Sequence, residues 1–472
     1  MNTMLTFEPF STETLKRIQP YIVQNTAHNS DLSAGFIYMW HRKDSRFCIY
    51  NDTLVIKQRL GDNSLFTYPV GKDVDGMIDE LLIYSRENKL PMRFYPVTEE
   101  ILERIKNDKR LQPVVGTYDR NWSDYIYSFE DMKEFKGRRF SGQRNHINKF
   151  KSLFGDPDIR FVKAEDMPEV RIFLEKYAEE HSDGGKMEMY ELNNTKQLLE
   201  VYSELGLYAA CMRIDGEISA LSIGEIVGDM LIIHVEKALT KYQGIYPTMF
   251  NGFVRLIAEY HKHPLTLVNR EDDSGDMGLR TSKQQYRPIG LVHKYIVNTN
   301  SPAGKVENNT VINGDGIVLT EICERDKAAY MKLNTDVANN RYWGYDYRED
   351  PTIPAEITED TFYDSVMYDM QVGDSINFAI RENENGEMIG EGIIWNFAND
   401  NTAEIGCRIL PEHHGKGYGK KAFGVLSDYA EKHLGLKVWA RSHKDNTASV
   451  HMIESNGFSE NRKDGDFLFF ER

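Results

Sequence analysis

The chain contains few cysteines and no long hydrophobic run. Only four of its 472 residues are cysteines, and they are widely separated: Cys48, Cys211, Cys323 and Cys407. This spacing argues against a disulfide framework and a CxxC metal site, and it favours reduced thiols. The most apolar segments, such as 230–235 and 389–395, are too short to cross a bilayer. Since the N-terminal sequence MNTMLTFEPF also lacks a secretory signal pattern, we expect a cytoplasmic protein without a transmembrane segment.

Basic residues are also in short supply. The chain has 57 Lys and Arg against 73 Asp and Glu, which gives a formal net charge of −16. This surplus of negative charge disfavours general binding to nucleic acids. It agrees better with a basic acceptor, for example a polyamine, an aminoglycoside or a lysine-rich terminus.

The composition changes most clearly at residues 298–316. This segment, NTNSPAGKVENNTVINGDG, is rich in Asn and Gly and shows no apolar periodicity, which is typical of a linker. A second turn-rich segment, FGDPDI at 154–159, indicates an inner boundary. We therefore predict an N-terminal module of two lobes, 1–155 and 156–298, a linker at 299–316 and a C-terminal domain at 317–472. Strands and helices alternate throughout, which predicts an α/β (α+β) fold.

Three glycines at alternate positions stand out in the C-terminal domain: Gly415, Gly417 and Gly419. They follow a strand that ends at Pro411 and open an amphipathic helix. Backbone N–H groups at such a helix N-terminus attract a pyrophosphate, and neighbouring lysines such as Lys416 and Lys420 add positive charge. A structural loop would use the same glycines, so the turn alone leaves the function open.

The order of elements around the turn is more specific. A strand, the glycine turn, a helix, a second strand, an Asn-containing loop at Asn446, a short helix and Gly457-Phe458 follow one another. The segment resembles motifs A and B of the GNAT superfamily of N-acetyltransferases, with His414 in place of the usual Arg or Gln. A dinucleotide-binding interpretation fits poorly because no acidic residue ends the next strand.

The resemblance, in particular to enzymes that acetylate ribosomal-protein N-termini, implies acetyl-CoA or another short acyl-CoA. The pyrophosphate would lie on the glycine turn and the pantetheine arm along the preceding strand. The implied cofactor-binding residues are Ile409, His414, Gly415, Lys416, Gly417, Tyr418, Gly419, Lys420 and Asn446.

Acyl transfer to an amine also needs a proton acceptor and a proton donor. Glu404, on the strand before the turn, matches the position of a base that acts directly or through water in relatives; an outward-facing strand carboxylate is the alternative. Ser449 is the candidate proton donor, since Ile453 replaces the Tyr of some relatives, or it is an ordinary helix N-terminal residue. An aromatic loop would wall an acceptor pocket or simply pack over the sheet: Tyr342, Trp343, Tyr345 and Tyr347.

Two charged segments mark the N-terminal module. Residues 136–151, KGRRFSGQRNHINKFK, hold basic and no acidic residues, which indicates an anionic partner or a solvated helix face. Residues 268–288 place acidic and basic side chains in a Gly-containing loop after an apolar run, as binding loops often do. The acidic residues would suit calcium, but their spacing does not match an EF-hand, and we predict no metal site.

These segments resemble a bacterial family of uncharacterised proteins related to the C-terminal domain of phosphatidylglycerol lysyltransferases, over most of residues 1–298. The matching motifs are Asp124-Tyr125, Lys136-Gly137, Arg144-Asn145 with Phe150, 221–225, 234–237, 242–247 and 269–272. The resemblance implies two tandem GNAT-like folds before the C-terminal one, and in the lysyltransferases an aminoacyl-tRNA donor. Candidate site residues are Arg144, Glu225, His234, Glu236, Arg270 and Glu271, with buried structural ion pairs as the alternative.

Together these patterns predict an acyl-CoA-dependent N-acyltransferase that acts on a small-molecule or peptide amine. The N-terminal module would bind or modify an acceptor. Two alternatives stay open. One is an aminoacyl-tRNA-dependent transferase that holds tRNA through Arg138, Arg139 and Arg144, and the other is a non-catalytic acyl-CoA sensor.

Overall fold

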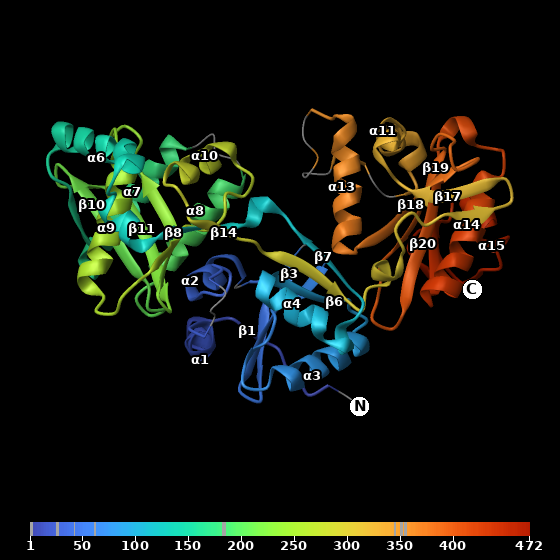
Figure 1. Ribbon diagram of the computed structural model, residues 1–472, viewed down its shortest axis with the longest axis horizontal. Helices are drawn as coiled ribbons and strands as arrows, with labels where there is room; N and C mark the ends of the chain where they lie inside the picture. The colour runs from blue at the N-terminus through green and yellow to red at the C-terminus, as the bar shows by residue number, and fades with distance from the viewer. Residues whose placement is uncertain are drawn as a thin grey trace.

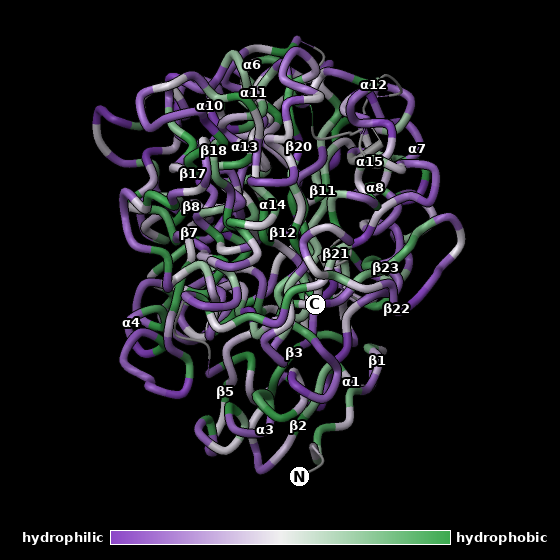
Figure 2. The backbone as a smooth tube through the Cα atoms, turned by 90° about the vertical axis from the view of Figure 1, so that its right-hand side faces the viewer, coloured by the Kyte–Doolittle hydropathy of each residue, from purple (hydrophilic) through white to green (hydrophobic). Residues whose placement is uncertain are grey.

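The computed structural model describes residues 3–24, 28–41, 43–60, 63–181, 186–343, 346–349, 353 and 356–472. They form a mixed α/β structure with three β-sheets, each of which is covered by helices, so the predicted fold class is confirmed (Figure 1). Hydrophilic residues concentrate in the outer loops, and hydrophobic segments lie inside (Figure 2). Among the described helices, none combines the length and the hydropathy needed to span a membrane.

The first sheet has the order β1-β2-β3-β4-β6-β15-β7, with β5 paired to β3. Its strands are β1 (Glu8–Pro9), β2 (Arg46–Tyr50), β3 (Thr53–Leu60), β4 (Asn63–Phe66), β5 (Val70–Gly71), β6 (Met92–Val97), β7 (Val114–Tyr118) and β15 (Tyr295–Thr299). β15 follows the whole second sheet in sequence, yet it inserts between β6 and β7 and is antiparallel to both. The chain therefore returns to the first lobe before the C-terminal domain begins.

The helical segments of this lobe are α1 (Thr12–Ile22), α2 (Ala34–Phe36), the π-helix η1 (Ile37–His41), α3 (Val74–Glu87), α4 (Glu99–Asn107) and the 3-10 helix η2 (Lys109–Leu111). A second 3-10 helix, η3 (Arg120–Trp122), connects β7 to the second lobe. α1 begins with a capping box between Ser11 and Thr14, and the Asp73 carboxylate caps α3. Apolar residues of α3 and α4, including Leu81 and Ile105, pack on the sheet in one buried cluster. This cluster is the lobe's own core.

The second sheet has the order β14-β8-β13-β12-β11-β10-β9, and only the β12–β13 pair is parallel. Its strands are β8 (Asp124–Ser128), β9 (Asp158–Phe161), β10 (Tyr208–Ile214), β11 (Glu217–Val227), β12 (Met230–Ala238), β13 (Leu267–Asn269) and β14 (Gly290–Val292). The helical segments are α5 (Phe129–Glu134), η4 (Arg138–Phe140), α6 (Ser141–Phe154), η5 (Ala164–Asp166), α7 (Met167–Glu180), α8 (Lys186–Leu199), α9 (Ile245–Tyr260) and α10 (Met277–Gln285).

The inner boundary expected at 155/156 falls inside this second lobe. β8, at the start of the lobe, pairs with β13 and β14, and α5 and α6 follow it directly. The turn-rich segment FGDPDI is the connection from α6 to β9, and Gly155 ends α6 with a φ of 82°. We therefore propose that the first lobe comprises 3–118 with 295–299 and that the second comprises 124–292.

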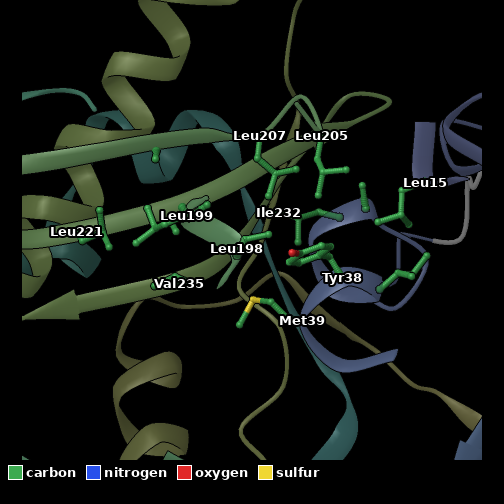
Figure 3. Packing of buried hydrophobic residues seen from close by; sticks show 14 of the residues in the cluster. Leu15, Tyr38, Met39, Leu198, Leu199, Leu205, Leu207, Leu221, Ile232 and Val235 are labelled. Atoms are coloured by element: carbon green, nitrogen blue, oxygen red, sulfur yellow. The ribbon is translucent and has the colours of Figure 1, made fainter. Parts of the chain in front are cut away.

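A shared hydrophobic core joins the two N-terminal lobes. Leu15, Tyr38 and Met39 of the first lobe pack against leucines of the second lobe and against Ile232 of β12 (Figure 3). The cluster continues into the first sheet through residues such as Phe47 and into the second sheet on β11. Since burial of apolar surface is the main favourable term in folding, the two lobes form one module.

The third sheet has the order β16-β17-β18-β19-β20-β21-β23-β22. Its strands are β16 (Ile312–Gly314), β17 (Ile317–Glu321), β18 (Ser375–Arg381), β19 (Gly390–Trp395), β20 (Thr402–Ile409), β21 (Lys437–His443), β22 (Ser459–Asp464) and β23 (Phe467–Glu471). Two apolar clusters flank the sheet, one with α11 and α13 and one with α14 and α15. The helical segments are η6 (Pro302–Lys305), η7 (Glu324–Asp326), α11 (Lys327–Thr335), α12 (Val337–Asn340), α13 (Glu359–Val372), η8 (Pro411–His413), α14 (Tyr418–Tyr429), η9 (Ala430–Leu434) and α15 (Thr447–Glu454).

The segment expected to be a linker contains regular secondary structure. It contains η6, and β16 pairs with β17 at the edge of the third sheet. The C-terminal domain meets the first lobe through polar contacts: Arg93 of β6 pairs with Asp374 at 2.7 Å, and Asn298 of β15 donates to the carbonyl of Val372. The end of α13 makes this contact, and Figure 1 shows α13 beside the first lobe.

Candidate functional site

The glycine turn of the C-terminal domain, residues 415–419, leads into α14. Gly415 has a φ of 75°, and Gly417, the N-cap of α14, has a φ of 80°, so both need the left-handed region that glycine tolerates. No side chain caps α14, which leaves the N–H groups of its first turn without an acceptor from a capping side chain. A Cβ atom at either glycine would meet no atom within 4 Å. The turn is therefore open, and it has the form of an anion site at a helix N-terminus.

The lysines of the turn are exposed, whereas Tyr418 and His414 form hydrogen bonds within the domain. Lys416 and Lys420 are exposed, and the Lys416 ammonium lies 5.9 Å from the centroid of the Tyr418 ring. The Tyr418 hydroxyl donates to Glu382. His414 Nε2 lies 2.8 Å from the carbonyl oxygen of Ile409, so this ring nitrogen is used to tie the turn to the end of β20.

The parallel strands β20 and β21 of the third sheet separate next to the turn. β20 and β21 pair in parallel only from Thr402 to Glu404, after which β20 pairs with β19 and β21 with β23. Asn446 caps α15 by accepting from the N–H of Ser449 at 3.2 Å. Its side chain makes no other hydrogen bond with a described residue. The opening between β20 and β21 is thus bordered by the glycine turn on one side and by α15 on the other.

Glu404 lies at the point where the strands separate. It is only 1% exposed, and its carboxylate accepts from Arg441 Nε at 2.9 Å and from Asn396 Nδ2 at 2.6 Å. Burial raises the pKa of Glu404, and the Arg441 guanidinium opposes this shift. The outward-facing alternative for Glu404 is therefore wrong. A buried carboxylate with a raised pKa is a suitable proton acceptor.

A pocket of about 670 Å³ opens on the α11 and α13 side of the same sheet. Alternation along the strands puts Glu404 of β20 on this face with Trp395 of β19, its register partner. Trp343 and Trp395 line the pocket, with their ring centroids 5.6 Å apart. Glu391 of β19 also lines it. Its carboxylate is held by Arg408, Tyr330 and Asn377.

The aromatic loop splits between the two expected roles. Trp343 lines the pocket, whereas Tyr347 packs edge-on against Phe362 and Tyr342 stacks on His443. Tyr345 lies outside the described residues. The loop therefore both walls the pocket and packs over the sheet.

All candidate residues of the N-terminal module except Arg144 form buried or partly buried ion pairs. His234 links two carboxylates, with Nε2 2.8 Å from Glu225 and Nδ1 2.7 Å from Glu271. Glu225 also accepts from the backbone N–H groups of Ala34 and Gly35 at the start of α2. Burial lowers the pKa of His234, but the two carboxylates outweigh it and raise the pKa to about 9. This hydrogen-bond chain fastens the first lobe to the second.

The other candidates are placed separately. Arg270 donates to Glu236 at 2.7 Å and lies over the rings of Phe250 and Tyr286. Arg144 instead donates to the backbone carbonyls of Phe135 and Gly137. The structure thus brings Glu225, His234 and Glu271 together and pairs Glu236 with Arg270, as the structural alternative predicted.

A second buried charge cluster was missed at the sequence level. Lys294, 1% exposed, lies 2.7 Å from Asp31, 2.9 Å from Asp124 and 3.4 Å from Asp272. Its one sequence signal is a lysine next to a histidine within the otherwise apolar run LVHKYIV at 291–297. Across the described part of the chain, no group of three His, Cys, Asp or Glu side chains is arranged to hold a metal ion.

The basic segment 136–151 is helical from Ser141, but acidic neighbours neutralise part of it. Lys136 lies within 4.0 Å of Glu130 and Glu134, Arg139 pairs with Asp131, and Lys151 pairs with Asp156. His146 and Lys149 remain exposed on α6. The segment is therefore less cationic in the fold than in the sequence.

Two protein families match this chain, one on each side of the segment 299–316. Residues 24–298 match the family described as phosphatidylglycerol lysyltransferase, C-terminal, and residues 317–459 match the acetyltransferase (GNAT) domain. The chain is similar to an uncharacterised Mycoplasmoides gallisepticum protein, 20% identical over 37% of this chain and 56% of that protein. It is also similar to the uncharacterised N-acetyltransferase YoaA of Bacillus subtilis, 26% identical over 31% and 82% of the respective lengths.

A solved structure resembles a large part of this chain. A conserved protein of unknown function from Bacteroides thetaiotaomicron is 24% identical, with a TM-score of 0.59 over 63% of this chain and 100% of that chain. This similarity concerns the fold. The tandem GNAT-like lobes and the third GNAT fold agree with both matched families. The chain belongs to the phosphatidylglycerol lysyltransferase C-terminal family and carries a C-terminal GNAT acetyltransferase domain.

Proposed function

We propose that the C-terminal domain is an acyl-CoA-dependent N-acyltransferase that uses acetyl-CoA or another short acyl-CoA and acts on an amine. The observation that carries this proposal is the open glycine turn at the N-terminus of α14, next to the opening between β20 and β21. The GNAT match over residues 317–459 supports it. The residues fit the donor because uncapped helix N–H groups and two exposed lysines suit a pyrophosphate.

The proposed roles of the protein groups follow from their positions. The N–H groups from Gly415 to Lys420 hold the pyrophosphate, and Asn446 has an amide group available for the pantetheine arm. When bound, acetyl-CoA supplies the acyl group as a thioester. Glu404 accepts the proton of the attacking amine, directly or through water, as the new N–C bond forms and the C–S bond breaks. Ser449 donates its hydroxyl proton to the leaving thiolate and takes up a proton from solvent water, so that CoA leaves as the free thiol.

An assay of thiol release tests this proposal. The full chain is supplied with acetyl-CoA and a panel of primary amines, and free CoA thiol is measured. We expect turnover with at least one amine, and we expect Glu404→Gln to lower kcat about a hundredfold or more without loss of acetyl-CoA binding. Glu460→Gln, an exposed carboxylate on β22, is the matched control and should leave kcat unchanged. Acetyl-CoA binding without thiol release from any amine would instead indicate a sensor.

The N-terminal module has a second candidate function. Its family match favours an aminoacyl-tRNA-dependent transfer, in which the basic segment of α6 and the preceding turn would contact tRNA. Replacement of Arg138, Arg139 and Arg144 by Gln should then abolish tRNA binding in a filter-binding assay. Unchanged binding, or none by the unmodified chain, would contradict this function.

A further inference from the structure

We infer that the amine acceptor is an alkyl diamine or polyamine, and that its site is shared between the C-terminal domain and the first N-terminal lobe. Asp369 of α13 is the residue that recognises the second cationic group. This inference rests on the proposed acyl transfer, whose acceptor it specifies.

The pocket of about 670 Å³ takes part of its wall from the N-terminal module. Lys89, Pro91 and Arg93, which lead into and begin β6, line it together with α11, α13, β18 and β19 of the C-terminal domain. Arg93 is buried and pairs with Asp374, which also accepts from Asn298 at 3.3 Å. Because the buried side chains of Arg93 and Asn298 make these contacts, the first lobe forms a fixed part of the pocket wall.

The pocket contains three carboxylates, but only one of them is free. Arg408 neutralises Glu391, and Arg93 neutralises Asp374. Asp369 lines the pocket and forms no hydrogen bond or ion pair through its carboxylate with any described residue. The Asp369 side chain is exposed at the mouth of the pocket; partial desolvation and the neighbouring Asp374 raise its pKa, and Arg93 opposes this shift. A ligand cation beside Asp369 would stabilise its ionised form, for which none of the described residues provides an ion pair.

The walls around this carboxylate suit an alkylammonium ion. Trp343, Trp395 and Phe362 line the pocket, and aromatic faces attract both methylene chains and ammonium groups. Asn396 also lines it and donates to Glu404, so the candidate proton acceptor lies directly behind the pocket wall.

The spacing of the two acidic ends sets the shape of the acceptor. Ser375, Trp395 and Glu404 are register partners across three neighbouring strands, so Ser375 and Glu404 are about 10 Å apart. Asp369 lies at the Ser375 end, because the N–H of Asp374 donates to its carbonyl at 2.8 Å. One amine beside Asn396, on the pocket side of Glu404, and a second cation at Asp369 therefore need an alkyl chain between them.

The test compares 1,5-diaminopentane with 1-aminopentane, which differ in the second ammonium group alone. Full-length chain and acetyl-CoA are used, and kcat and KM are measured by thiol release. We expect kcat/KM for the diamine to exceed that for the monoamine at least tenfold. We expect Asp369→Asn to remove this preference mainly through a higher KM for the diamine, with the monoamine unaffected. Asp364→Asn, an exposed carboxylate on the same helix, should behave as the unmodified chain.

A binding measurement separates this inference from the proposed function. 1,5-Diaminopentane is titrated calorimetrically into the chain saturated with CoA. Binding that is lost in Asp369→Asn supports the inference even without turnover. Acetyl-CoA binding with no diamine binding, or equal use of the two amines, would overturn the inference alone. Failure to bind acetyl-CoA would contradict the proposed function, while the diamine titration of the CoA-free chain would still decide the role of Asp369.

Discussion

Two helices of this chain begin with the same backbone geometry but in different surroundings. Gly244 before α9 has φ 84° and ψ 7°, and Gly417 before α14 has φ 80° and ψ 4°; neither helix has a side-chain cap. A Cβ at Gly244 would overlap the carbonyl oxygen of His146 on α6, whereas a Cβ at Gly417 meets nothing within 4 Å. In the second lobe, α6 thus covers the N-terminus of α9. In the C-terminal domain, the N-terminus of α14 is open.

This difference explains why a common fold need not bind a common ligand. Near α9 the described residues leave a hollow of about 310 Å³, lined by side chains such as Gln143, His146 and Tyr246. The α14 turn has lysines and no cover. Since a pyrophosphate needs direct access to backbone N–H groups, we expect acyl-CoA to bind at the C-terminal domain alone.

The largest effect is expected from closing the open turn. The double variant Gly417→Glu and Gly419→Glu places two carboxylates where the pyrophosphate would lie, so acetyl-CoA affinity should fall at least a hundredfold in a calorimetric titration. Gly435→Glu is the matched control, since Gly435 also has a left-handed φ and open space around it but lies after η9. Equal loss of affinity in both variants would indicate general damage to the domain.

Substitution by alanine should lower the free energy of unfolding more at Gly244 than at Gly417. Gly244→Ala forces a methyl group against the α6 backbone and into a left-handed φ, so we expect a loss of about 2–4 kcal/mol in the free energy of unfolding. Gly417→Ala meets only the φ penalty, which is about 1–2 kcal/mol. Urea denaturation of each variant measures both values. Similar losses at the two positions would show that the covering of α9 by α6 is not tight.

The third expected effect concerns pH and the N-terminal module. The raised pKa of His234 means that its protonation contributes stability below about pH 6.5, and this contribution is lost as the pH rises through about 9. The loss should be about 2 kcal/mol between pH 7 and pH 9. Urea denaturation at these pH values should show a flatter dependence for His234→Gln, while His146→Gln on the surface of α6 should keep the original slope. An unchanged slope in His234→Gln would contradict the assignment.

Local patterns predicted the C-terminal domain well. The alternate glycines marked the start of α14 to within one or two residues. This feature could be predicted because a short segment requires a left-handed φ, which glycine adopts readily, at Gly415 and Gly417. For the same reason the order of motifs identified both families correctly.

Long-range features could not be read in the same way. The turn FGDPDI signals an end of α6, and nothing in it tells a helix–strand connection from a lobe boundary. β15 pairs with β7 across about 180 residues of the chain, and the Lys294 cluster draws on four separate segments. The interpretation of His414 as a cofactor residue did not anticipate that its ring would bind Ile409. The shared pocket likewise depends on the ion pair between Arg93 and Asp374, which lie far apart in the sequence.

The most direct test of the account is hydrogen exchange of the backbone amides, measured by mass spectrometry with and without acetyl-CoA. The account predicts that acetyl-CoA slows exchange in peptides that cover residues 415–421 and leaves those that cover 243–249 unchanged. Protection at 243–249, or at neither turn under saturating acetyl-CoA, would contradict it.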